Sequence, residues 1–237
     1  MYIKVLKDNN EIASTISDLI VENIRNKPNL LLCAATGGTP TQTYQQLVDK
    51  RAHYSTEQLR VIKLDEWGGV PMDNPETCES YIQKHILKPL NIHPENYFGF
   101  NSNAPNAEKE IQRIKSALKK NGPIDICILG LGMNGHIAFN EPPSDINSEC
   151  HIATLSKESL LHPMAVGMDA APTCGLTLGI QEIMQSKKIF LIITGEHKQE
   201  IAKAFLTGNV SKHLPASYLW MHSDVHCYID QKANNKK

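Results

Sequence analysis

The residues best suited to moving protons lie between positions 125 and 142, in a stretch that ends LGLGMNGHIAFNEP. His136 titrates near neutral pH, so it can both accept and give up a proton. Glu141 follows five residues later and is expected to orient the imidazole or stabilise its charge, while Asn134 precedes the histidine. Gly135 belongs to the same glycine-lined turn, and we expect it to contact a ligand. A lone histidine is usually structural, but this combination favours a catalytic one.

A second candidate for acid-base chemistry is the pair Asp65 and Glu66, which directly follows the apolar run RVIKL. A carboxylate that is partly removed from water has a raised pKa and can act as a base toward a carbon acid. The alternative reading is that Asp65 only caps the next segment. The residues alone leave both readings of Asp65 open, and Glu66 is expected to line the same ligand site.

A third stretch, Thr36, Gly37, Gly38 and Thr39 followed by Pro40, could bind an anion. Backbone N–H groups of a glycine loop at a helix start converge on phosphate, and a Cβ there would keep the anion away. Lys198, in TGEHK, could place an ammonium over the same crevice. The alternatives are an ordinary turn and a solvated lysine. The pattern is neither GxxxxGK[ST] nor GxGxxG, which argues against a nucleotide.

The sequence lacks the motifs of several other kinds of catalytic or metal-binding site. The sequence has no GxSxG, no HExxH and no cluster of Cys and His at metal-binding spacing, so we expect neither a metal nor a cofactor. The six cysteines include no CxxC pair and are predicted to be reduced. Cys78 lies near His85 at helical spacing, where a partly buried thiol is the ordinary interpretation.

The elements that must position these residues alternate between short apolar runs and longer helical patterns, which is typical of an α/β fold with a mainly parallel sheet. Strands are predicted at 30–35, 60–64, 125–131 and 188–194, and helices at 41–50, 74–90, 107–120 and 196–206, with Thr39 as an N-cap. No linker or repeat divides residues 1–237, so one domain is expected, with a frayed tail after Asp230. In such sheets ligands bind beyond the carboxyl ends of the strands, where all three stretches fall.

The composition and charge limit the kinds of binding partner that we expect for this protein. The net charge is −1, which gives no reason to expect nucleic acid or an anionic membrane as a partner. No apolar run approaches the roughly 20 residues of a membrane span, and the N-terminus shows no signal-type segment, so a cytoplasmic location is predicted. A small diffusible molecule is the expected partner, and self-association to a homo-oligomer is left open.

Four motifs in the same order, ATGGTP with Tyr44 downstream, LDEW, LGLGMNGHIAFNEP and TGEHK, resemble the superfamily of glucosamine-6-phosphate deaminases and 6-phosphogluconolactonases. FNEP is similar to the deaminase branch, because lactonases usually carry a sequence like Ser-Leu-Phe-Pro there. KLDEW, ETCESYIQKHI, LGxNGH and LPASYLWMHS look most similar to galactosamine-6-phosphate deaminase/isomerases. The resemblance implies a three-layer α/β/α Rossmann-like fold and a metal-free reaction on a hexosamine 6-phosphate.

The resemblance also implies roles for residues. Asp65 matches the base that moves a proton between C2 and C1, His136 the group that assists ring opening, and Glu141 its carboxylate partner. Residues 36–39 and Lys198 match the phosphate site. The implied reaction converts galactosamine 6-phosphate to tagatose 6-phosphate and ammonia by isomerisation with deamination. The alternatives are a glucosamine-6-phosphate deaminase that gives fructose 6-phosphate, isomerisation without deamination, a 6-phosphogluconolactonase, and a non-catalytic sugar-phosphate sensor.

This sequence departs from the glucosamine-type pattern at three places. Asn134 stands where those enzymes usually have Asp, a change that the galactosamine-type group shares. The arginine that supplements phosphate binding is missing from residues 156–168, where His162 or Lys157 would have to replace it. CHIAT stands at 150–154 in place of the basic pair of the activator site. We therefore expect no activation by an N-acetylated sugar phosphate.

Overall fold

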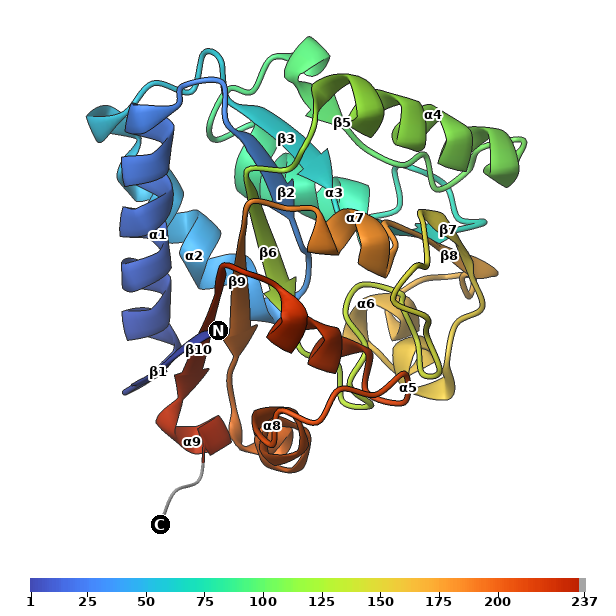
Figure 1. Cartoon of the computed structure of the whole chain (residues 1–237). Coiled ribbons are helices and arrows are strands. Elements are labelled where there is room, and N and C mark those ends of the chain that lie inside the picture. The colour runs from blue at the N-terminus through green and yellow to red at the C-terminus, as the bar shows by residue number, and fades with distance from the viewer. Residues whose placement is uncertain (235–237) are drawn as a thin grey trace.

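The computed structural model describes residues 1–234. Its main feature is a sheet of seven strands, all paired in parallel, in the order β1, β10, β9, β6, β2, β3, β5 (Figure 1). The central strands are buried on both faces, which explains why their sequences are continuously apolar. The bounds are Tyr2–Leu6 for β1, Leu31–Ala34 for β2, Arg60–Lys63 for β3, Tyr97–Phe98 for β5, Ile126–Gly130 for β6, Lys188–Ile193 for β9 and Val225–Asp230 for β10.

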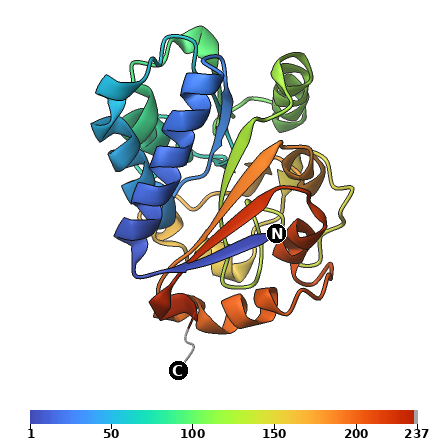
Figure 2. The same cartoon turned by 60° about the vertical axis from the view of Figure 1, so that its left-hand side comes forward.

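One face of the sheet is covered by α1 (Asn9–Asn26) and α2 (Gly38–Asp49), which lie side by side in Figures 1 and 2. The fully buried side chains Ile12, Ile16 and Ile20 recur every four residues and so form one helix face. Asp8 caps α1 by accepting a hydrogen bond from the N–H of Glu11 at 3.0 Å. The short helix α3 (Cys78–Ile82) and the π-helical turn Gln83–Leu87 complete this layer.

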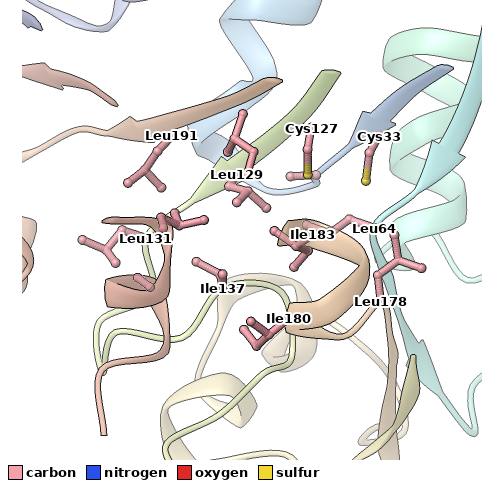
Figure 3. Packing of buried hydrophobic residues seen from close by; sticks show 14 of the residues in the cluster. Cys33, Leu64, Cys127, Leu129, Leu131, Ile137, Leu178, Ile180, Ile183 and Leu191 are labelled. Carbon is pink, nitrogen blue, oxygen red and sulfur yellow. The ribbon is translucent and has the colours of Figure 1, made fainter. Parts of the chain in front are cut away.

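The opposite face packs against α4 (Ala107–Asn121), α7 (Ile180–Met184), α8 (Gln199–Leu206) and α9 (Gln231–Asn234). Figure 3 shows Cys33, Cys127 and Leu129 of the strands pointing at side chains of these covering segments, among them Ile180 and Ile183. The predicted three-layer α/β/α Rossmann-like architecture is therefore confirmed. Within residues 1–234, no helix is long and apolar enough to cross a membrane.

A second, antiparallel sheet was not predicted. It joins β4 (Asp65–Gly68), β8 (Cys174–Thr177) and β7 (His151–Ala153) in the order β4, β8, β7. The chain leaves the main sheet at Leu64, so Asp65 opens this small sheet directly beyond the end of β3. Two short helices, α5 (Lys157–Leu160) and α6 (Pro163–Val166), follow β7.

All four predicted strands are confirmed to within two residues at either end, whereas several helix boundaries differ. The predicted N-cap Thr39 is wrong: α2 begins at Gly38, and Gly37 is the cap. The helix predicted over 74–90 begins only at Cys78, because Thr77 is its N-cap and accepts from the N–H of Ser80 at 3.1 Å. The predicted fraying after Asp230 is wrong for 231–234, which form α9, and residues 235–237 lie outside the described part. All six cysteines are free, as predicted.

Candidate active site

A pocket lies beyond the carboxyl ends of β2, β6 and β9, where a parallel sheet is expected to bind its ligand. It brings together most of the side chains that the sequence singled out, although they come from distant segments. Its lining includes Thr36, Gly37, Gly38, Thr39, Asp65, His136, His162 and Lys198.

Asp65 is a buried carboxylate at the floor of this pocket. Burial and then the charge of neighbouring Glu66 raise the pKa of Asp65 to about 7, against the opposing effects of Lys63 and of the Cys78 thiol. The Cys78 Sγ lies 3.9 Å from Asp65 Oδ1 and 3.2 Å from the hydroxyl of Thr36. Asp65 therefore exchanges its proton near neutral pH, as a general base should.

His136 is paired with Glu141, whose Oε2 lies 3.2 Å from the imidazole Nδ1. Although burial alone would raise it, the pKa of Glu141 is lowered to about 2, chiefly by His136 and then by hydrogen bonds from Ser159 and Asn134. Asn134 donates its amide to Glu141 Oε2 at 2.8 Å and accepts from the N–H of His136 at 3.1 Å. Glu141 is therefore a fixed anion that orients the histidine, and Asn134 acts behind the pocket rather than in it.

The turn that carries this pair depends on close packing. A Cβ on Gly132 would lie within 2.5 Å of three atoms of the His136 ring, so only glycine fits there. Ala138, just after the histidine, has a left-handed φ of 52°. The buried amide of Asn140 donates to the carbonyls of Ile137 and Leu178, each at 2.9 Å, and holds the turn against the residue that follows β8, the central strand of the small sheet.

The loop at 36–39 leads into the N-terminus of α2. Gly37 has φ 89° and ψ −178°, a conformation that is essentially restricted to glycine. Within residues 1–234, no protein group accepts a hydrogen bond from the N–H groups of Gly38 or Thr39, and a Cβ on Gly38 would meet no atom within 4 Å. Free amides, open space and the positive end of a helix together make an anion site.

Two cationic or polar side chains face the same loop. Lys198 lines the pocket and donates from Nζ to the carbonyl of Leu131 at 2.5 Å, and burial lowers its pKa. His162 accepts from the N–H of Met164 on Nδ1 at 3.3 Å, which leaves Nε2 as the nitrogen that carries the proton of the neutral ring. That Nε2 would lie 3.6 Å from a Cβ on Gly37, so the ring borders the anion site.

Two residues predicted to contact the ligand lie elsewhere. Glu66 is fully buried beneath the pocket, where its oxygens accept from backbone amides and pair with Lys63. Gly135 faces away, since a Cβ there would lie 2.2 Å from Leu214 Cδ1. Its positive φ of 86° serves the turn rather than the ligand. Lys157, the other substitute considered for the missing arginine, is likewise absent from the pocket lining.

Sequence reasoning missed three residues of the site. Ser159 lines the pocket and donates its hydroxyl to Glu141 Oε1, and Trp67 lines it with its ring centroid 4.6 Å from that of Phe139. Cys78 was interpreted as an ordinary buried thiol, but it lies beside Asp65. The sequence held a signal only for Trp67, which directly follows Asp65 and Glu66. Ser159 and Cys78 reach the site through tertiary packing, which no local pattern shows.

The arrangement can therefore bind an anion at one end and move protons at the other. Within the described residues 1–234, no group of three or more His, Cys, Asp or Glu side chains is placed to hold a metal ion. The side chains that lie in or behind the pocket are suited to acid-base chemistry on a small anionic molecule.

Comparison with known proteins agrees with this site. Residues 8–227 match the family described as glucosamine-6-phosphate isomerases/6-phosphogluconolactonase, and the chain belongs to this family. The resemblance drawn from the motifs is thereby confirmed.

Similar proteins cover nearly the whole chain. "Putative deaminase AgaI" of Escherichia coli K12 is 38% identical over 92% of this chain and 88% of its own length. Glucosamine-6-phosphate deaminase 1 of Bacillus subtilis 168 is 35% identical over 94% of each chain. The solved structure of a monomeric glucosamine-6-phosphate deaminase superimposes with a TM-score of 0.96 at 34% identity, over 100% of both chains.

Proposed function

We propose that this protein isomerises and deaminates a hexosamine 6-phosphate, releasing ammonia and a ketohexose 6-phosphate. The observation that carries the proposal is the presence, in one pocket, of a buried carboxylate with a pKa of about 7 and helix-start amides that donate to no protein group within residues 1–234. Family membership and deaminase relatives at 34–38% identity support the same reaction.

We infer the following order of steps for this reaction. The amides of Gly38 and Thr39, with Lys198 and the Nε2 side of His162, bind the 6-phosphate and anchor the sugar. His136, held by Glu141, transfers a proton between the ring oxygen and the C1 hydroxyl, so the pyranose opens to an aldehyde. Asp65 then removes the acidic C2 proton while O1 takes up a proton from His136, which gives an enolamine.

Completion of the reaction requires only proton transfer and water. Protonation of the enolamine at C1 by Asp65 gives an iminium at C2. Water adds to that carbon, ammonia leaves with the bonding electrons, and the ketose carbonyl forms. Trp67 and Phe139, packed edge to face in the pocket wall, help to exclude bulk water from the intermediate.

For the particular substrate we favour galactosamine 6-phosphate, with tagatose 6-phosphate and ammonia as products. Asn134 supports this choice because the galactosamine-type enzymes that the sequence resembles share an Asn at this position, where glucosamine-type enzymes usually have Asp. Its amide donates to Glu141, which an ionised Asp could not do. Glucosamine 6-phosphate, giving fructose 6-phosphate, is the second candidate, since two of the relatives compared above carry the name glucosamine-6-phosphate deaminase.

The test is ammonia release from both hexosamine 6-phosphates, assayed side by side with Asp65→Asn as the inactive control. Release from either that disappears in the control supports the reaction and the base, and the ratio of kcat/KM values identifies the epimer. Hydrolysis of 6-phosphogluconolactone without ammonia release would instead establish a lactonase, and binding without turnover a sensor. N-acetylglucosamine 6-phosphate is expected to leave the rate curve unchanged.

A further inference from the structure

Glu66 lies beneath the pocket in a cluster of buried charges that the proposed chemistry does not use. The cluster consists of Lys63 from β3, Glu66 from β4, and Glu79 from α3. Lys63 is fully buried, and its Nζ lies 2.5 Å from Glu66 Oε2 and 2.8 Å from Glu79 Oε2. The same ammonium donates to the carbonyl of Phe100 at 2.9 Å, so all its protons are used.

The carboxylate of Glu66 joins two elements that both border the pocket. Its Oε1 accepts from the N–H groups of Trp67 at 2.8 Å and Cys78 at 2.9 Å, and its Oε2 accepts from the N–H of Glu79 at 2.8 Å. The first of these donors belongs to β4 and the other two belong to the start of α3. The carboxylate therefore fixes the strand that begins with Asp65 against the helix whose Cys78 thiol touches Asp65.

The charges in this cluster do not balance. Two carboxylates share one ammonium, which leaves one negative charge beneath the pocket floor. Burying this extra negative charge without a second cation is unfavourable in a low-dielectric interior, so it costs folding free energy. Glu66 is directly adjacent to Asp65, and its charge opposes ionisation of that neighbour.

We propose that Glu66 is a positioning residue for Asp65: it locks β4 to α3 and keeps one fixed negative charge beside the base. This deepens the proposed function, on which its kinetic consequence rests. The charge makes Asp65 a stronger base, since a nearby negative charge makes loss of the Asp65 proton less favourable. The hydrogen bonds from β4 and α3 to Glu66 keep the Asp65 carboxylate oriented toward the pocket.

Other groups around Asp65 act on the same equilibrium. Its titratable and charged neighbours besides Glu66 are Lys63 on β3, Cys78 on α3, Cys33 on β2 and Tyr44 on α2. The rest of the pocket lining adds His136, His162, Lys198 and the exposed Glu158. Among these, burial raises the pKa of Cys78, Cys33 and Tyr44, so they remain neutral near pH 7. Glu66 is thus the neighbouring anion whose removal isolates the effect.

The experiment follows the carboxyl carbon of Asp65 by NMR in substrate-free protein labelled with ¹³C-aspartate, with the signal assigned through Asp65→Asn. In Glu66→Gln the midpoint of the Asp65 titration is expected to fall by on the order of one pH unit. The matched control Asp73→Asn removes an equal charge from an exposed position on the following loop, and no shift is expected. An unmoved midpoint in folded Glu66→Gln overturns the proposal.

Glu66→Asp keeps the charge but withdraws it from the amides of α3, and it serves if Glu66→Gln does not fold. Here the midpoint is expected to stay within a few tenths of a unit of wild type, while kcat falls roughly tenfold or more and KM is unchanged. Wild-type kcat, or a midpoint near the ordinary aspartate value, contradicts the proposal. The titration needs no substrate, so its result is independent of the activity assay. Failure to detect ammonia release would contradict the proposed function but not the effect of Glu66 on Asp65.

Discussion

Asp65 combines a raised pKa with a place in the pocket, and as the base of the proposed reaction it should set the pH dependence of the rate. Its pKa of about 7 means that the carboxylate form is lost as the pH falls below neutrality. We expect kcat/KM at pH 6 to be about a tenth of its plateau value. A pH–rate profile between pH 5 and 9 checks this, and a rate that stays constant down to pH 5 would contradict it.

The same carboxylate should destabilise the fold at alkaline pH. Its pKa is raised above the unfolded value of 3.8, so the folded state binds the proton more tightly, and stability falls as the pH rises from about 4 through 7. At pH 8 the cost is about 4 kcal/mol, an upper figure for a buried group. Asp65→Asn removes it and is expected to be more stable than wild type at pH 8. Urea unfolding at pH 8 and pH 4 measures the difference, which should vanish at pH 4.

At the residue scale, the sequence was enough to predict the side chains that line the pocket but not the side chains that hold them in place. His136, Asp65 and Lys198 could be proposed because their residue types follow strands, and the pocket contains all three. The sequence did not show which of Asp65 and Glu66 lines the pocket. Adjacent residues in a strand point to opposite sides, and nothing in the sequence says which side faces the ligand. Ser159 reaches Glu141 from 18 positions away, a contact that no local pattern encodes.

At the scale of elements, the start of α2 is the feature to test. Gly38→Ala places a methyl group where no protein atom lies within 4 Å, in the space assigned to the phosphate. Alanine favours a helix over glycine by up to about 1 kcal/mol, so the variant should be at least as stable as wild type. The methyl group would disturb the proposed phosphate contacts, which are charge-assisted, so KM is expected to rise roughly tenfold or more.

Thermal unfolding and steady-state kinetics measure both effects. Gln42→Ala, at an exposed position of the same helix, is the matched control and should leave KM as in wild type. A KM for Gly38→Ala equal to that of the control would show that the phosphate is bound elsewhere.

The elements themselves were predictable to different degrees. Buried parallel strands such as β2 were clear, because LLCA is apolar on both faces. The small sheet was not, since β4 carries the polar pair Asp65 and Glu66, and β8 reaches it from 106 positions further on. The start of α2 was placed late, because Gly37 caps the helix through its backbone conformation and provides no side-chain signal.

At the scale of the whole molecule, packing controls thiol reactivity. Five of the six cysteines are buried, and Cys174 is only partly covered. An aromatic disulfide reagent should therefore modify one thiol rapidly in the native protein and all six after unfolding. Rapid modification of Cys78 would mean that the pocket is open to bulky reagents, and protection by a bound sugar phosphate would then locate the ligand.

The order of the main sheet differs from the order in which a ribosome makes its strands. β2, β3, β5 and β6 lie together at one side of the sheet and are complete once residue 130 has been made. β1, although made first, pairs only with β10, which spans Val225–Asp230. During translation β1 must therefore wait for β10 with its backbone N–H and C=O groups unpaired, and this open strand edge is a surface for chaperones to shield until Val225–Asp230 has been made.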